Sequence, residues 1–245
     1  MTWGIFILWA VGVTSFTLLG SLYARRYERI DLLVGLYVAF VLTAQVLATK
    51  LALFHSPIGS FTVPAGVLVF SVTFLLTDIV NERFGRRETQ RMIFIAFIAQ
   101  IAMTFFIWLG VQFEPAPLRA LEAERFDAIF GLLPRITLAS WLAFIVSENI
   151  DAYLYAWFKR VTHEKHLWMR NALSTLPALA VDSAIFVTLA FWGAGSALIM
   201  SAIIGQIMIK WVIGIINIPF MYLNHVILTR GKHTPDRVLW DEGSE

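Results

Sequence analysis

Cysteine is absent from the 245 residues of this chain, and histidine is sparse. Without cysteine, the chain can form neither disulfide bonds nor thiolate metal sites. The five histidines are scattered at positions 55, 163, 166, 225 and 233, which is not the spacing of a zinc cluster. We therefore expect no metal site and no cofactor.

Charge is also scarce: Asp, Glu, Lys and Arg make up 15% of the residues, against roughly 25% in an average soluble domain. Hydrophobic residues reach 58%, too many for a soluble fold of this size to bury. This composition excludes a soluble enzyme, a disordered tail and a fibrous repeat. The motifs G-x-S-x-G and H-E-x-x-H and the P-loop are missing as well, so we predict that the protein is not an enzyme.

Long apolar stretches replace the missing charge, and a membrane-spanning helix needs about 20 mostly apolar residues. The sequence predicts seven spans, and hence an all-α polytopic helical bundle. They cover residues 2–22, 32–54, 62–80, 92–112, 136–158, 171–193 and 198–228. The connection 113–135 holds an acidic amphipathic segment, which we interpret as a helix on the membrane surface or, alternatively, as an ordinary loop.

Lysine and arginine are divided very unequally between the two sides of the predicted bundle. Fourteen of the 19 fall in connections on one side, three on the other, and Lys50 and Lys210 fall inside predicted spans. Cytoplasmic loops carry the excess of positive charge in membrane proteins. We therefore expect a multi-pass protein of the cytoplasmic membrane with its N-terminus outside and its C-terminus in the cytoplasm.

Seven ionisable residues fall within or at the edge of the predicted spans. They are Lys50, Asp78, Glu82, Glu148, Asp151, Asp182 and Lys210. Left unpaired at the bilayer centre, each costs roughly 2.5–3.5 kcal/mol on insertion scales, so they must pair or line a hydrated cavity. Five acids against two lysines leave some acids for water, a proton or a ligand.

Helical spacing puts these residues on shared faces together with nearby polar residues. The groups are Asp78 with Glu82, Glu148 with Asp151, Ser174 with Asp182, Gln206 with Lys210 and Asn217, and Gln45 beside Lys50. The simplest arrangement is one polar core that several helices share, as in a small-solute carrier. Local pairs remain the alternative: Asp78 and Glu82 with loop arginines, and Asp182 or Glu148 with a lysine that locks helix packing.

Four sequence blocks carry a more specific signal. They are LTAQVLATKLALF (42–54), LTDIVNERFGRR (76–87), ENIDAYLYAWFKR (148–160) and RNALSTLPALAVDSAIF (170–186). Together with the last helix around Lys210, they resemble the queuosine precursor transporter family, also called vitamin-uptake-transporter-like. Gln45 stands where that family usually has Asn, and Glu148 where Gln is frequent, which leaves the exact solute open.

The resemblance implies a carrier for the uptake of a 7-deazaguanine base (preQ0, preQ1 or queuine) that works without an ATPase. It also implies a six-helix core, residues 31–230, similar to the substrate-binding subunits of energy-coupling-factor transporters. Residues 1–30 then form an added helix with a basic loop, and 231–245 a cytoplasmic tail. The solute would contact the charged and amide residues named above, with Phe74, Phe186 or Trp211 stacking on its ring.

The alternative function is a substrate-capture subunit for another heterocyclic vitamin-like solute. In that case Ala44, Ala48 and Ala52 would form the face that docks onto a partner motor. The expected partners are the small molecule and the lipid bilayer, and no nucleic acid. The coupling ion, H⁺ or Na⁺, and the oligomeric state stay open.

Overall fold

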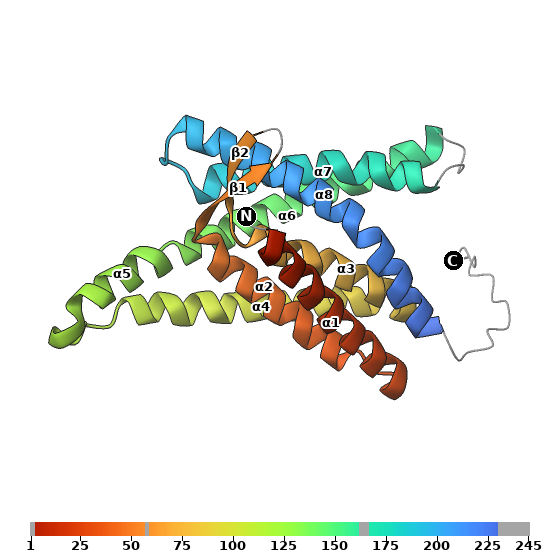
Figure 1. The fold of residues 1–245 in the computed structure, drawn as a ribbon, viewed down its shortest axis with the longest axis horizontal. Helices are drawn as coiled ribbons and strands as arrows, with labels where there is room; N and C mark the ends of the chain where they lie inside the picture. Colours follow the sequence, from red (N-terminus) through yellow and green to blue (C-terminus); the bar gives the residue numbers. More distant parts are fainter. Residues whose placement is uncertain (1–2, 57–58, 162–166, 230–245) are drawn as a thin grey trace, which may run out of the picture.

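The computed structural model describes residues 3–56, 59–161 and 167–229. Eight α-helices and one two-stranded antiparallel sheet make up most of this part of the chain (Figure 1). The helices are α1 (Trp3–Tyr27), α2 (Asp31–Ala48), α3 (Val67–Phe84), α4 (Arg86–Val111), α5 (Ala120–Phe130), α6 (Leu133–Val161), α7 (Leu167–Ala190) and α8 (Ser196–Thr229). The strands are β1 (Leu51–Ser56) and β2 (Gly59–Pro64), and a 3₁₀ turn (Pro117–Arg119) precedes α5.

Five segments of the described chain are long and apolar enough to cross a membrane. They are Ile7–Tyr27, Asp31–Ala48, Arg87–Val111, Pro117–Ser147 and Ser196–Ile213. Two shorter apolar helical segments, Val67–Asn81 and Leu176–Ala190, fall in α3 and α7. The prediction of a helical multi-pass membrane protein is therefore confirmed, whereas the count of seven spans stays a prediction.

The hairpin of β1 and β2 corrects the predicted second and third spans. The span 32–54 was expected to stay helical to Phe54, but α2 ends at Ala48 and β1 begins at Leu51. The span 62–80 was expected to begin at Thr62, but that residue pairs with Leu53 in the hairpin. A short apolar run of four to eight residues fits a strand as well as a helix, and hydrophobicity alone does not separate the two.

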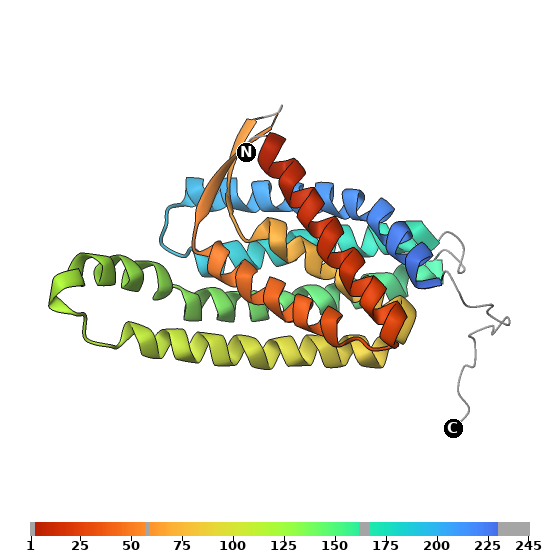
Figure 2. The same ribbon diagram turned by 60° about the horizontal axis from the view of Figure 1, so that its bottom comes forward.

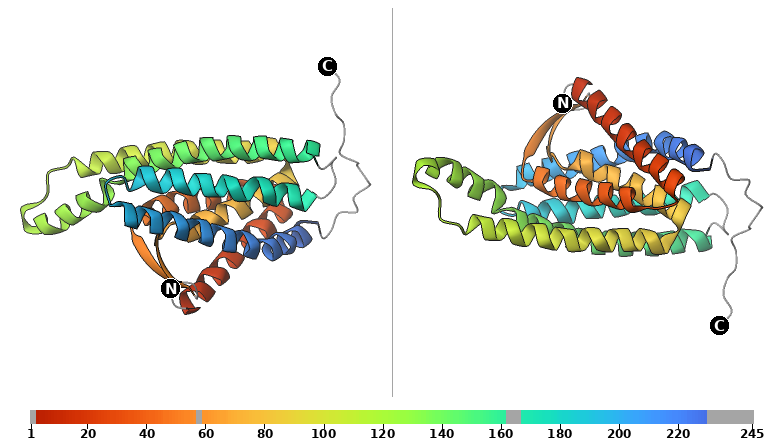
Figure 3. Two further views of the ribbon diagram at one scale, coloured as in Figure 1. Left: turned by 90° about the horizontal axis from the view of Figure 1, so that it is seen from above. Right: turned by 90° about the horizontal axis from the view of Figure 1, so that it is seen from below.

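Two hydrophobic clusters hold the bundle together. The first cluster packs helices α1, α2, α3 and α4 together through large side chains such as Leu33, Leu76 and Met92. The second packs α6, α7 and α8 together through residues such as Ile136 and Val187. Helices α4, α6, α7 and α8 run side by side, and α1 crosses the bundle obliquely (Figures 2 and 3). Large apolar side chains also cover the outside of α4, including Phe94, Ile98 and Phe105. Such an exposed apolar face suits contact with lipid tails.

The basic connections gather at one end of the molecule. The α1–α2 turn, the α3–α4 junction and the far ends of α6 and α8 all lie toward the right in Figures 1 and 2. The α4–α5 connection and the turn between α7 and α8 lie at the opposite end. α5 confirms the helical interpretation of the acidic segment, and the described side chains of α5 are all at least partly exposed.

Candidate functional site

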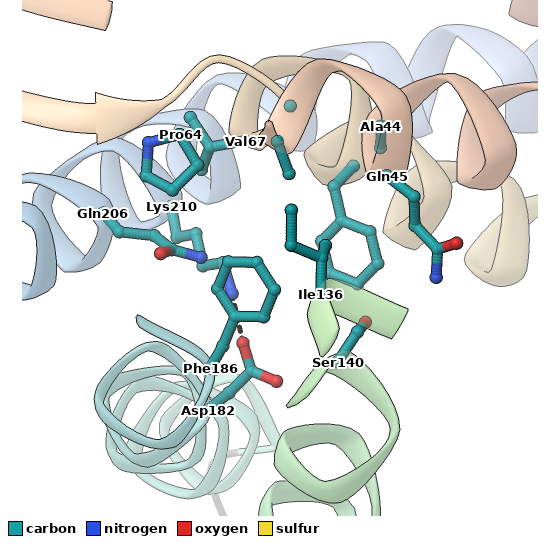
Figure 4. Close-up of a pocket in the computed structure, with 13 residues that line it drawn as sticks. Ala44, Gln45, Pro64, Val67, Ile136, Ser140, Asp182, Phe186, Gln206 and Lys210 are labelled. Atoms are coloured by element: carbon teal, nitrogen blue, oxygen red, sulfur yellow. Dashed lines mark hydrogen bonds and ion pairs between the residues drawn. The ribbon is translucent and has the colours of Figure 1, made fainter. Parts of the chain in front are cut away.

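A pocket opens where five helices converge (Figure 4). About 450 Å³ of space lies between its lining atoms, a volume that includes the open solvent at its mouth. Its walls come from α2, α3, α6, α7, α8 and the end of β2. The lining residues are Ala44, Gln45, Ala48, Pro64, Gly66, Val67, Phe70, Ile136, Ser140, Asp182, Phe186, Gln206 and Lys210.

Small residues bring the backbones around the pocket close together. A Cβ atom on Gly66, at the start of α3, would lie 2.0 Å from the Ala44 carbonyl oxygen of α2. A Cβ atom on Gly205 of α8 would lie 2.5 Å from a methyl carbon of Val63 in β2. The backbone N–H of Thr62 also donates a hydrogen bond to the hydroxyl oxygen of Ser201, at 3.2 Å. The hairpin is therefore fixed against α8 beside the pocket.

An ion pair lies in the pocket wall between α7 and α8. The ammonium group of Lys210 donates to a carboxylate oxygen of Asp182, and the Lys210 side chain is only 2% exposed, that of Asp182 13%. The same ammonium nitrogen lies 5.4 Å from the centre of the Phe70 ring, within the range of a cation–π contact. Pairing is what permits two charges at this depth, because an isolated buried charge is strongly unfavourable.

Gln206, one turn before Lys210 on α8, brings an unsatisfied group to the same wall. The residue is 4% exposed, and its side-chain carbonyl oxygen has no hydrogen-bond partner in the described part of the structure. A buried acceptor without a donor costs about 1–3 kcal/mol. A solute that carries an N–H group is a natural partner for this oxygen.

Gln45 of α2 reaches the pocket from the side away from Gln206 and Lys210 (Figure 4). Its amide N–H donates to the side-chain carbonyl of Gln100, and its own carbonyl accepts the hydroxyl of Thr137 at 3.2 Å. The pocket is thus polar at both ends, with the aromatic rings of Phe70 and Phe186 among its lining residues.

Four of the predicted site residues come together here: Gln45, Asp182, Gln206 and Lys210. Between the two lysines offered as partners for Asp182, the structure places Lys210 in contact and Lys50 elsewhere. The predicted position of Lys50 inside a span is wrong. Lys50 follows the end of α2, is exposed, and does not line the pocket.

The other five predicted residues have side chains outside the described part of the structure. They are Asp78 and Glu82 in α3, Glu148 and Asp151 in α6, and Asn217 in α8. Arg83, one of the arginines expected near the α3 acids, contacts Glu28 of the α1–α2 turn at 3.1 Å; its pairing with those acids stays a prediction.

Phe70 and Ser140 also line the pocket, although the sequence did not predict them, and of the three candidate aromatics only Phe186 lines it. Phe74 packs edge-on against Phe70, with ring centres 5.4 Å apart. Trp211 is exposed and donates to the carbonyl of Leu176 at 3.4 Å. Phe70 precedes Phe74 by one helical turn, so the sequence shows the two aromatic residues as a pair. It does not show which of the two rings faces the pocket.

The small-residue stripe of α2 is not a docking face. Ala44 and Ala48 are buried and line the pocket, and Ala52 belongs to β1 rather than to the helix. The expected motor-docking surface is therefore wrong, because α3 approaches too closely at Gly66 to leave that face free.

Comparisons with known proteins place this chain in a family. Residues 64–224 match a family model described as "Putative vitamin uptake transporter". The chain belongs to this family. A curated relative from Bacillus subtilis (strain 168), named "Probable queuosine precursor transporter", is 32% identical over 163 residues, which cover 66% of this chain and 71% of the relative. No solved structure matches the chain significantly.

Membership of this family confirms the resemblance drawn from the four sequence blocks. It also makes the protein a multi-pass membrane transporter rather than an enzyme. The family match contains Asp182, Gln206 and Lys210, while Gln45 lies before its first residue.

Proposed function

We propose that this protein takes up a queuosine precursor, a 7-deazaguanine base such as preQ0, preQ1 or queuine, across the cytoplasmic membrane. The relative from Bacillus subtilis supports the solute class by its name, at 32% identity. The observation that carries the proposal is the pocket itself, in which an ion pair and a partnerless buried carbonyl share a wall with two aromatic rings.

The chemistry of a deazaguanine matches these groups. Its N1–H and exocyclic amine are adjacent donors, which one carboxylate accepts together, and Asp182 is the described carboxylate in the wall. Its carbonyl oxygen is an acceptor for Lys210 or for an amide N–H. Phe70 and Phe186 supply flat apolar surface for the ring system.

The ion pair explains how the empty pocket tolerates its charges. Lys210 neutralises Asp182 while no solute is bound, and a solute with donors on one edge and an acceptor beside them can engage both partners without leaving either unpaired. Gln206 then gains the donor that it lacks. Binding therefore exchanges hydrogen bonds rather than exposing a charge to lipid.

The seven-span topology, the N-out orientation and the six-helix core at 31–230 belong to the same proposal. The gathering of the basic connections at one end of the bundle supports the orientation. We propose transport by the protein alone, without an ATPase. The burial of Ala44 and Ala48 removes the docking face on which the alternative of a capture subunit relied.

Uptake into vesicles that contain only the purified protein tests this function. Wild-type protein should accumulate or equilibrate radiolabelled preQ1 or preQ0 faster than empty vesicles do. Lys210→Met should abolish uptake, whereas Lys50→Met, the same chemical change at an exposed site, should leave it intact. No uptake of preQ0, preQ1 or queuine by wild-type protein would reject the solute class.

A further inference from the structure

A chain of hydrogen-bonded polar side chains, buried or half-buried, leads from the pocket to α4 and α6. It consists of Gln45 on α2, Gln100 and Thr104 on α4, and Thr137 and Trp141 on α6. Gln45, Gln100 and Thr137 are all less than one-tenth exposed. Of these residues only Gln45 lines the pocket, so the other four can act on a solute only through Gln45.

The direction of every hydrogen bond in this chain follows from one group that can only donate. The indole N–H of Trp141 has no acceptor capacity, so the Gln100 atom that it contacts at 3.0 Å is the carbonyl oxygen. That oxygen also receives Gln45, which must therefore present its nitrogen. The carbonyl of Gln45 is then turned toward Thr137, whose hydroxyl donates to it at 3.2 Å.

The hydroxyl hydrogens complete the order. Thr137 has a single hydroxyl hydrogen, and it is used on Gln45. The contact of 3.0 Å between Thr104 and Thr137 is therefore a donation from Thr104 to Thr137. Thr104 thus lies at the end of the chain, where its loss changes nothing in the orientation of Gln45.

In this orientation of the side-chain amide, one of the two N–H groups of Gln45 has no acceptor among the described residues. The amide nitrogen carries two hydrogens, one of which goes to Gln100. The second forms no hydrogen bond with the described residues, and Gln45 is part of the pocket wall. The Gln45 nitrogen therefore keeps one N–H that a solute can use, while the carbonyl oxygen is turned toward Thr137 on α6.

We propose that Trp141, Gln100 and Thr137 are positioning residues that hold the Gln45 amide with an N–H toward the solute. The pocket then selects a planar heterocycle that carries a carbonyl-type acceptor on the edge facing α2, and discriminates against one that carries an amino group there. This inference rests on the proposed function, because it assigns a selectivity rule to the same pocket.

A purely structural role for the network predicts something different. Hydrogen bonds between membrane helices contribute to packing, and every member would then matter in proportion to the bonds that it makes. A positioning role predicts that only the groups that fix the Gln45 amide affect which solute is preferred. Thr137 and Thr104 distinguish the two roles, because the two threonines are hydrogen-bonded to each other and only Thr137 also contacts Gln45.

Competition between two bases in vesicles provides the test. The probes are 7-deazaguanine, with an oxygen at C6, and 7-deaza-2,6-diaminopurine, with an amino group there, each measured as an inhibitor of preQ1 uptake. The wild-type protein should favour 7-deazaguanine. Thr137→Val should lower that preference roughly three- to tenfold, the effect of one hydrogen bond, while Thr104→Val keeps it within about twofold.

Trp141→Phe is the second variant. It keeps an aromatic ring against Phe97, whose centre lies 4.5 Å from that of Trp141, but removes the donor that orients Gln100. It should lower the preference like Thr137→Val. An unchanged preference in both variants, or an equal loss in Thr104→Val, would overturn the inference while uptake by wild-type protein upholds the proposed function. If wild-type protein binds neither probe nor preQ1, the proposed function fails and takes the inference with it.

Discussion

Lys210 and Asp182 pair at a depth where each charge depends on the other. Removing two charges from water is expensive, and only mutual attraction with good geometry offsets it. The pair also lies in the pocket wall, where we propose that the solute binds. On that proposal, one residue pair links the stability of the protein to its transport.

Breaking this pair should cost more than removing it. Lys210→Met leaves the Asp182 carboxylate buried without its cation, which should lower the free energy of unfolding by about 3–5 kcal/mol. The double variant Lys210→Met/Asp182→Asn removes both charges and should recover most of that loss. Thermal unfolding in detergent measures both. A double variant as unstable as the single one would contradict mutual neutralisation.

Replacing Gln206, unlike replacing Lys210, should impair transport without lowering the stability of the protein. Gln206→Met keeps the size of the side chain but removes the partnerless carbonyl, so the midpoint of thermal unfolding should stay level or rise by a few degrees. The apparent KM for uptake should rise about tenfold, since the solute loses an acceptor. A clear fall in the unfolding midpoint would show that the protein itself uses this carbonyl.

Lys50 and Lys210 show how far single residues were predictable. Both lysines follow apolar runs that contain a glutamine, so the sequence predicted both of them as charges inside the membrane. Only the position of the helix end separates them, because α2 stops before Lys50 and α8 continues past Lys210. Pairing of Asp182 with a lysine was therefore predictable from charge balance, but the choice of lysine was not.

At the scale of elements, the hairpin was the main departure from prediction. Residues 51–54 and 62–64 are short apolar runs that adjoin the neighbouring helices, so a hydrophobicity scan merges them into the spans 32–54 and 62–80. The signal that was present is the sequence Ser56-Pro57-Ile58-Gly59, which interrupts the two apolar runs. Gly59 has a φ of 140°, a backbone conformation that favours glycine. Proline and glycine between short apolar runs indicate a turn rather than a continuing helix.

Gly66 should be the position where α2 and α3 tolerate no side chain. Gly66→Ala places a methyl group against the Ala44 carbonyl, which forces the helices apart beside the pocket and should cost about 1–3 kcal/mol of stability together with uptake. Gly35→Ala is the matched control, because it lies in α2 with open space around it and should stabilise the helix slightly. Thermal unfolding and uptake of both variants check this. Equal behaviour would contradict the close contact.

For the whole molecule, helical membrane character followed from composition alone, because a chain with so few charges cannot cover its own surface with polar groups. The site did not follow in the same way. Helical spacing identified polar faces one helix at a time, whereas the pocket depends on how five helices cross. Those crossings are set by packing at positions such as Gly66 and Gly205, which one sequence does not reveal as contacts.

The orientation of the bundle yields the last prediction, and the absence of cysteine makes it directly measurable. Glu122 on α5 and Arg87 at the start of α4 are both exposed, and α4 joins the two ends of the bundle between them. With the basic end in the cytoplasm, a membrane-impermeant maleimide should label Glu122→Cys in intact cells, and Arg87→Cys only after permeabilisation. The unmodified chain, having no thiol, is the blank. The reverse labelling pattern would invert the topology, and labelling of both positions from outside would mean that α4 does not cross the membrane.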